Sequence, residues 1–202
     1  FASGECVKAS SSEEFTFIII TSPTTTYYPG EVNVVVETHF TRAPRGGVGY
    51  AKAAGNYAAS FYPTKQANAK GFTQLIWTDA KEHKYIEECG TMNIWFRIND
   101  TLITPELNDS ILGGFTRDSL ITLARENGIK VEERKISVDE VLEAYNNGIL
   151  KEVFGTGTAV TVAPIHSITV GDKKIEIESQ INSYASKLKK ILQGIQNGSI
   201  ED

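Results

Sequence analysis

Apolar and β-branched residues gather in short runs along the chain, and glycine, proline and polar residues separate these runs. Runs rich in valine, isoleucine, threonine and aromatic residues are typical of β-strands. We predict strands at residues 15–21, 32–38, 73–78, 94–98, 130–136 and 160–170. The first run contains Phe15-Thr16-Phe17-Ile18-Ile19-Ile20 and is the most apolar, so we expect a buried strand there.

Helical spacing and capping residues indicate the helices. We predict helices at residues 56–70, from Thr116 to Gly128, from Ser137 to Gly148, and from Ile181 to about Gly198. Thr116 is expected to cap the second, and Ser137 opens the third with a capping box that ends at Glu140. Pro63 inside the first implies a kink or a helix in two parts. Strands and helices mix without strict βαβ alternation, which favours an α+β fold or a mixed barrel.

The composition is that of an ordinary globular domain. The chain has 202 residues, of which 41% are hydrophobic and 22% charged, enough to bury one sizeable core. A formal net charge of −5 without a lysine or arginine block argues against nucleic-acid binding. The most apolar run is far shorter than the roughly 20 residues of a membrane span, so no membrane partner is expected.

The number and spacing of the cysteines and histidines bear on the cellular location and on metal binding. Cys6 and Cys89 are too few for a disulfide framework, and no leader with a basic start precedes them, which predicts a cytoplasmic, reducing location. The three histidines show no metal-ligand spacing with either cysteine, so no metal site is expected. The chain also has no phosphate loop ending in Gly-Lys-Ser or Gly-Lys-Thr and no Gly-x-Ser-x-Gly turn.

The most informative segment is residues 46–57, GGVGYAKAAGNY, which sets Lys52 among small residues just ahead of an expected helix. A lysine reacts as an amine only when its ammonium group loses a proton, which requires a desolvated or electropositive pocket. Neighbouring glycines let a flat cofactor approach the backbone closely. Taken alone, the segment is more typical of a solvated surface lysine, because lysine is almost never fully buried.

Four later segments change that interpretation: ECGTMN at 88–93, LITP at 102–105, ILGGFTRD at 111–118 and EVFGTGTA at 152–159. In this order after the lysine segment, they resemble the class IV (fold type IV) pyridoxal-phosphate aminotransferases, and most closely the branched-chain amino acid aminotransferases. The resemblance extends over about residues 1–177. It implies that residues 1–202 form the large PLP-binding domain of such enzymes, a strand-built pseudo-barrel flanked by helices. The family's smaller N-terminal domain has no counterpart in these residues.

The resemblance also implies which residues are catalytic and which bind the cofactor ring. Lys52 matches the family's Schiff-base lysine and proton shuttle, and Tyr57 matches the tyrosine that hydrogen-bonds the phenolic oxygen of the cofactor. Glu88 matches the glutamate that binds the pyridine nitrogen, because it stands five positions before Asn93. Its neighbour Glu87 is expected to face the opposite way, since side chains alternate along a strand.

Phosphate and substrate contacts follow from the same resemblance. Backbone amides of Phe115 and Thr116, at the start of a helix, and the hydroxyl of Thr158 are expected to bind the phosphate. Thr91 and Leu112 match positions near the pyridine ring. A further set is expected to contact the substrate: the amides of Thr158 and Ala159 at its carboxylate, and Tyr27 beside its side chain.

The implied function is amino-group transfer from leucine, isoleucine or valine to 2-oxoglutarate, with pyridoxal 5'-phosphate as cofactor, in branched-chain amino acid biosynthesis. Family members pair as homodimers. Two other class IV activities share the lysine and the glutamate, those of D-amino acid aminotransferase and aminodeoxychorismate lyase. A third alternative is a non-catalytic, truncated core that binds the cofactor without turnover.

Overall fold

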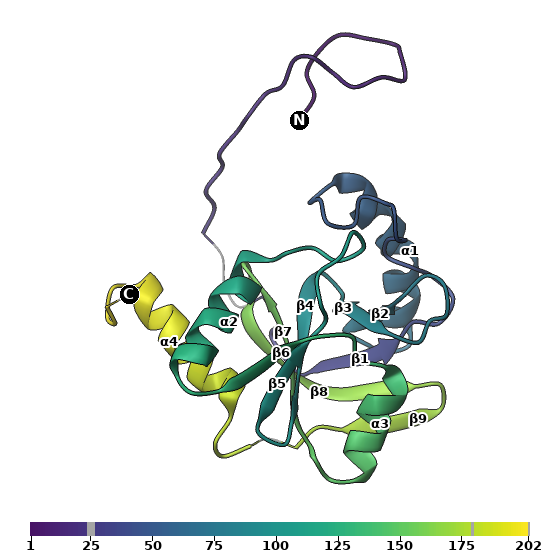
Figure 1. Ribbon diagram of the computed structural model, residues 1–202. Coiled ribbons are helices and arrows are strands. Elements are labelled where there is room, and N and C mark those ends of the chain that lie inside the picture. The colour runs from purple at the N-terminus through teal and green to yellow at the C-terminus, as the bar shows by residue number, and fades with distance from the viewer. Residues whose placement is uncertain (24–26, 179, 202) are drawn as a thin grey trace.

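The computed structural model describes residues 1–23, 27–178 and 180–201. Figure 1 shows a body of mixed strands and helices, from which the N-terminal segment projects. The strands are β1 (Val32–Val36), β2 (Gln74–Thr78), β3 (Ile86–Cys89), β4 (Met92–Ile98), β5 (Thr101–Thr104), β6 (Lys130–Glu133), β7 (Leu150–Gly157), β8 (Thr161–Val170) and β9 (Lys173–Glu176). The helices are α1 (Ala54–Ala69), α2 (Phe115–Glu126), α3 (Val138–Asn146) and α4 (Tyr184–Gln196).

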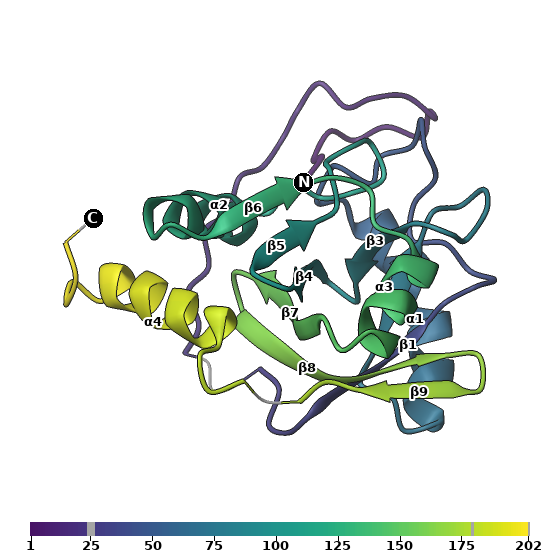
Figure 2. The ribbon, with the colours of Figure 1, turned by 60° about the horizontal axis from the view of Figure 1, so that its bottom comes forward.

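The sheet closes on itself. Its strands follow the order β3-β2-β1-β8-β7-β4, and β4 pairs back with β3 to complete a ring (Figure 2). β1 runs parallel to both of its neighbours, and the other pairs in the ring are antiparallel. β5 and β6 extend the sheet beyond β4, and β9 extends it beyond β8. The predicted α+β pseudo-barrel is therefore confirmed.

The inside of the ring is apolar. β1 shows the alternation that this requires, because Val32, Val34 and Val36 are buried while the residues between them are partly exposed. Ile136 and Val141, at the start of α3, belong to the same buried cluster. α3 therefore covers one end of the barrel, and the turns between β3 and β4 and between β7 and β8 lie at the other end.

Helices cover the outside of the barrel. α2 and α4 pack on β7 and β8, over a second buried cluster in which the rings of Trp95 and Phe154 stack with centroids 5.8 Å apart. α1 packs on β2, where Leu75 and Trp77 are buried. Among the described residues, no helix is both long and apolar enough to cross a membrane.

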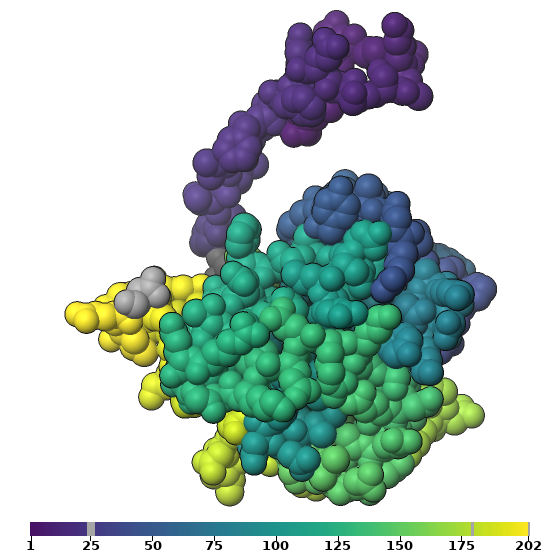
Figure 3. All heavy atoms as spheres, in the orientation of Figure 1, coloured from purple at the N-terminus to yellow at the C-terminus, as the bar shows by residue number. Residues whose placement is uncertain are grey.

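The N-terminal prediction is wrong. Residues 15–21 were expected to form a buried strand, but they run through an extended arm that stands clear of the body (Figures 1 and 3). Phe17 and Ile19 are 87% and 78% exposed, and Phe15 makes only an isolated bridge to Ala2. A strand is buried only when neighbouring strands cover it, and the described residues place none beside this run.

The helix boundaries test the capping residues that the sequence predicted. Ser137 caps α3 as predicted, since its hydroxyl accepts a hydrogen bond from the Glu140 amide at 3.0 Å. Thr116 does not cap α2, because Gly114 occupies that position and Thr116 already lies in the first turn. α1 continues through Pro63. The C-terminal helix begins only after its Ser183 cap, so Ile181 lies outside it and is exposed.

Candidate active site

Lys52 lies immediately before α1 and faces the first turn of that helix. Its ammonium nitrogen Nζ donates a hydrogen bond to the hydroxyl Oη of Tyr57 at 2.6 Å. The side-chain amide of Asn56 donates to the carbonyl oxygens of Val48 and Ala51, at 2.8 and 2.9 Å. Asn56 therefore fixes the glycine-rich loop against the start of α1, and the loop holds Lys52 beside Tyr57.

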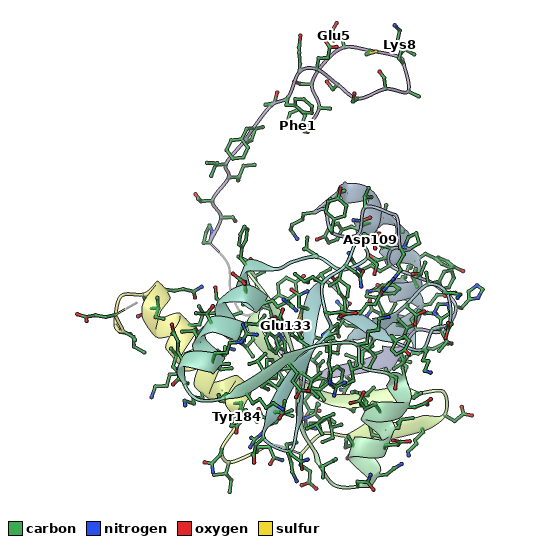
Figure 4. All side chains as sticks on the ribbon, viewed as in Figure 1. Phe1, Glu5, Lys8, Asp109, Glu133 and Tyr184 are labelled. Carbon is green, nitrogen blue, oxygen red and sulfur yellow. The ribbon has the colours of Figure 1, made fainter. Side chains whose placement is uncertain are left out.

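A second loop braces the lysine segment from the other side. Asp109 accepts hydrogen bonds from the amides of Gly46, at its carboxylate, and Tyr50, at its carbonyl, with distances of 2.6 and 3.1 Å. Figure 4 labels Asp109 close to α1. Gly49 packs so closely on Ser110 that a β-carbon there would lie 2.5 Å from the Ser110 carbonyl oxygen. The close contact between these two loops therefore requires glycine at position 49.

Glu88 is the buried carboxylate of the site. It lies on β3 with 3% of its surface exposed, and its Oε2 is 3.0 Å from Nε of Arg42. The amide of Leu112 donates a hydrogen bond to its Oε1 at 2.6 Å. Burial, with a smaller contribution from the neighbouring Glu87, raises the pKa of Glu88 to about 7 against the opposing effects of Arg42 and Leu112.

A β-bulge corrects the expectation that Glu87 and Glu88 face opposite ways. Across the β2–β3 pair, Trp77 lies opposite Glu88 and Thr78 lies opposite Ile86, so Glu87 is an extra residue without a partner. Glu87 is also buried, with 5% of its surface exposed. Strict alternation would have separated the two carboxylates, whereas the bulge brings both toward the loop at residues 108–112.

The start of α2 provides hydrogen-bond donors for an anion. No side chain caps this helix, and its first backbone amides, including those of Phe115 and Thr116, have no partner within the helix. Such a terminus favours negative charge. Gly114, before it, packs against the side chain of Asn93, which donates to the carbonyl of Leu112 at 2.7 Å. A β-carbon at Gly114 would collide with Asn93.

The predicted cofactor residues converge in part. Tyr57, Glu88, Thr91 and Leu112 line one small cleft, and Lys52 joins it through its hydrogen bond to Tyr57. The structure therefore brings together the predicted lysine, tyrosine and glutamate with two predicted ring contacts. The proposed phosphate donors connect to this cleft through Leu112 and Asn93, although the side chain of Phe115 itself is 87% exposed.

The predicted substrate contacts lie elsewhere. Thr158 and Ala159 are exposed in the turn between β7 and β8, and Tyr27 is 47% exposed. Tyr27 and Ala159 line a second depression together with residues of β8 and α4. This turn approaches the turn between β3 and β4 at Gly157, where a β-carbon would lie 3.9 Å from the carbonyl oxygen of Thr91.

Three residues of the site were not predicted from the sequence: Arg42, Asn56 and Ser110. Only Asn56 carried a signal, because it stands inside the glycine-rich segment at the start of an expected helix. Arg42 and Ser110 stand in ordinary polar stretches, and their contacts reach across the fold to β3. Such contacts exist only after the barrel has formed.

The residues present fit pyridoxal phosphate. The cleft offers an amine paired with a hydroxyl, and a buried carboxylate that, among the described residues, accepts one hydrogen bond from Leu112 and lies in an ion pair with Arg42. A carboxylate has about four acceptor sites, so Glu88 can accept a further hydrogen bond, such as one from a protonated ring nitrogen. The uncapped start of α2 suits a phosphate.

Comparison with known proteins agrees with this geometry. Residues 2–168 match the family described as amino-transferase class IV. The chain is 46% identical to a probable branched-chain-amino-acid aminotransferase of Staphylococcus aureus, over 100% of this chain and 58% of that protein. The chain thus spans little more than half the length of this relative.

Solved structures show the same fold. A branched-chain amino acid aminotransferase of Escherichia coli superimposes with a TM-score of 0.75 at 28% identity, covering 90% of this chain and 58% of that one. A branched-chain aminotransferase of Thermobaculum terrenum, solved in its PLP-form, gives 0.72 at 26% identity, covering 85% and 52%. The chain therefore belongs to the class IV aminotransferases.

Proposed function

We propose that the protein is a pyridoxal-phosphate-dependent branched-chain amino acid aminotransferase, which moves the amino group of leucine, isoleucine or valine to 2-oxoglutarate. The observation that carries the proposal is the convergence of Lys52, Tyr57 and buried Glu88 on one cleft. The names of the relatives support the substrate class, since those described above are branched-chain enzymes.

Each of these three side chains has its own role in the proposed reaction. Lys52 would hold the cofactor covalently and, when the substrate amine displaces it, would carry a proton between two carbon atoms. Tyr57 would orient Lys52 and bind the phenolic oxygen of the cofactor. Glu88 would keep the ring nitrogen protonated. When bound, the cofactor supplies the electron sink that the proton transfer needs.

The remaining predicted residues complete the cofactor and substrate sites in this proposal. Phe115 and Thr116 would bind the phosphate through their amides, with the Thr158 hydroxyl, and Thr91 and Leu112 would contact the ring. Two further contacts concern the amino acid. The amide of Ala159 would meet its carboxylate beside that of Thr158, and Tyr27 would line the pocket for its branched side chain.

Reduction with borohydride tests the proposal directly. Peptide mapping of the protein reduced with pyridoxal phosphate should find the cofactor on Lys52. Lys52→Arg should abolish this labelling and turnover of L-leucine. Lys65→Arg is the matched control, because Lys65 is an exposed lysine on α1, and it should leave both unchanged. Labelling of another lysine in the unmodified protein would refute the assignment.

A coupled assay separates the class IV alternatives. A branched-chain enzyme should accept L-leucine with 2-oxoglutarate and leave D-alanine unreacted. Preference for D-alanine would indicate a D-amino acid aminotransferase, and release of pyruvate from aminodeoxychorismate would indicate the lyase.

The domain arrangement is a further part of the proposal. We expect residues 1–202 to form the large domain of a longer, homodimeric, cytoplasmic enzyme with a small N-terminal domain. Two features support a missing neighbour: the exposed apolar arm at residues 15–20, and Phe61 and Tyr62 on α1, which are 66% and 61% exposed. If residues 1–202 act alone as a non-catalytic core, they should bind the cofactor without turning over leucine, whereas the longer protein should be active and dimeric by light scattering.

A further inference from the structure

Ser110 lies between two oxygen atoms beneath the cleft. Its hydroxyl oxygen Oγ is 2.5 Å from Oε1 of Glu87 and also 2.5 Å from Oδ1 of Asn108. The backbone amide of Ser110 donates to the same Oδ1 at 2.7 Å, which fixes that atom as the amide oxygen of Asn108. All three side chains belong to the bulge of β3 or to the loop that follows β5.

Counting protons resolves this arrangement. A serine hydroxyl carries one hydrogen and can donate to only one of the two oxygens. The oxygen of Asn108 has no hydrogen to give, so the Ser110 hydroxyl must donate to Asn108. A hydrogen then lies between the oxygens of Ser110 and Glu87 only if the Glu87 carboxyl group carries it.

The charges around Glu87 agree with a neutral acid. Arg42 is the cation closest to the pair of glutamates, and its Nε lies against Glu88. Its Nη2 donates to the carbonyl oxygens of Gly49 and Ser110 at 2.9 and 2.5 Å, so it is not shared with the carboxyl of Glu87. One buried arginine therefore balances one buried carboxylate.

Groups on neighbouring elements act on Glu87 more weakly. Burial raises its pKa most and the charge of Asp79 adds to this, whereas the hydrogen bond with Ser110 and the charges of Arg42 and Arg45 act in the opposite direction. Charges of both signs also line the cavity on this side of the bulge, namely Lys81, Glu82, Glu106 and Lys135. The second oxygen of Glu87, Oε2, is buried and accepts no hydrogen bond from the described residues.

We propose that Glu87 is a positioning residue that acts as a protonated acid: it donates to Ser110, Ser110 donates to Asn108, and the loop at residues 108–112 is thereby held so that the Leu112 amide meets Glu88. Glu87 does not touch the cofactor in this arrangement. The proposal deepens the proposed function, because it concerns the support of the carboxylate assigned to the cofactor ring, and its importance for cofactor binding rests on that assignment.

Loss of the proton should loosen this support. An ionised Glu87 would need the Ser110 hydroxyl as a donor, so the bond from Ser110 to Asn108 would break. It would also place a second negative charge beside Glu88. Both changes act on the loop that carries the Leu112 amide. The support should therefore hold while Glu87 is protonated and weaken as the pH rises through its raised pKa.

The first experiment observes the proton itself. Glutamate labelled with ¹³C at the side-chain carboxyl reports protonation by NMR, and Glu87→Gln assigns the resonance in the cofactor-free protein. We expect the Glu87 carboxyl to remain protonated above the ordinary pKa range of a glutamate, and the Leu112 amide signal to shift as Glu87 ionises. Ionisation of Glu87 within the ordinary range would overturn the proposal. This readout does not depend on cofactor binding, so it stands even if the proposed function fails.

The second experiment measures pyridoxal-phosphate affinity by absorbance across a range of pH. Glu87→Gln retains a donor to Ser110 and should keep the affinity within about twofold at neutral pH, while losing any alkaline weakening. Glu87→Ala and Ser110→Ala remove the link and should weaken binding by about tenfold. Glu82→Gln, in the same cavity but exposed, is the control and should match the unmodified protein. Equal affinity of Glu87→Ala and Glu87→Gln would overturn the positioning role.

Discussion

Two buried glutamates of the barrel have similar surroundings but different numbers of hydrogen-bond donors. Glu88 on β3 and Glu152 on β7 are 3% and 6% exposed, and each lies against an arginine. Glu152 accepts hydrogen bonds from Arg97, from the Ser183 hydroxyl and from two backbone amides at the start of α4. Within the part of the chain that the structure describes, Glu88 has one hydrogen-bond donor, the Leu112 amide, and the charge of Arg42 beside it.

The difference separates a structural carboxylate from one with capacity for a ligand. The four donors to Glu152 lie at 2.7 to 3.0 Å and join β4, β7 and the first turn of α4, where Figure 4 labels Tyr184. These bonds fill about as many acceptor sites as a carboxylate has. About half of the acceptor sites of Glu88 have no donor among the described residues. A buried acceptor without a donor lowers stability, so these sites favour a ligand that can donate. A buried acceptor with spare capacity in a cleft is what a cationic ring nitrogen requires.

The largest expected effect concerns turnover. Glu88→Gln keeps the size of the side chain but removes the charge that we propose holds a proton on the cofactor ring, so kcat for L-leucine should fall by at least about a hundredfold. Glu152→Gln should leave kcat within about twofold among the molecules that remain folded. Single-turnover absorbance measurements check both. A larger loss at Glu152 would break the distinction between the two carboxylates.

Stability should show the reverse order. Glu152→Ala leaves Arg97 without its buried partner and removes an acceptor from three donors of α4, so the free energy of unfolding should fall by about 3 kcal/mol or more. Urea unfolding followed by tryptophan fluorescence measures this change. Cofactor affinity at low urea should remain that of the unmodified protein, and a matching loss of affinity would contradict a purely structural role.

The pH dependence sharpens the comparison. The pKa of Glu88 is raised to about 7, so its proton contributes stability that is complete at acid pH and is lost as the pH rises from the unfolded value toward 7. Against the ordinary value of 4.5, this loss amounts to about 3 kcal/mol. The cofactor-free protein should therefore lose stability relative to Glu88→Gln over that interval. A constant difference between the two proteins would show that Glu88 titrates normally.

The smallest expected effect comes from removing one of the hydrogen-bond donors to Glu152. Ser183 caps α4 by accepting from the Ser186 amide at 3.1 Å and also donates to Glu152. Ser183→Ala should lower the free energy of unfolding by about 1 kcal/mol, as loss of a helix cap usually does. Urea unfolding measures it, with Ser186→Ala as a control on the same turn. A fall in the free energy of unfolding as large as that of Glu152→Ala would mean that the other donors to Glu152 contribute little.

Sequence patterns predicted the strands in which β-branched residues dominate, and they failed where pairing creates the strand. Val32–Val36 and Thr161–Val170 form β1 and β8 as expected. β3 was missed, since two adjacent glutamates and a bulge hide its alternation. The arm at residues 15–20 is as apolar as β1 but exposed, because apolar character describes a tendency and burial also requires a covering surface.

The site was predictable to the extent that it lies in local motifs. Lys52 and Tyr57 are five positions apart in one motif and meet at the start of α1, so the resemblance of that single segment was enough to assign both. The partner of Glu88 could not be found in this way, because the ion pair with Arg42 joins β3 to the loop after β1. No feature of the stretch around Arg42 differs from that of a solvated arginine until the barrel brings it to Glu88.

The bulge on β3 also has a meaning for how such a chain can vary. Because Glu87 is the residue without a cross-strand partner, removing it would leave Ile86 opposite Thr78 and Glu88 opposite Trp77, with their faces unchanged. Position 87 thus adds a side chain to the site without adding a pair to the β2–β3 ladder. A chain that lacked this residue would lose the link to Ser110 and keep the carboxylate of Glu88 opposite Trp77.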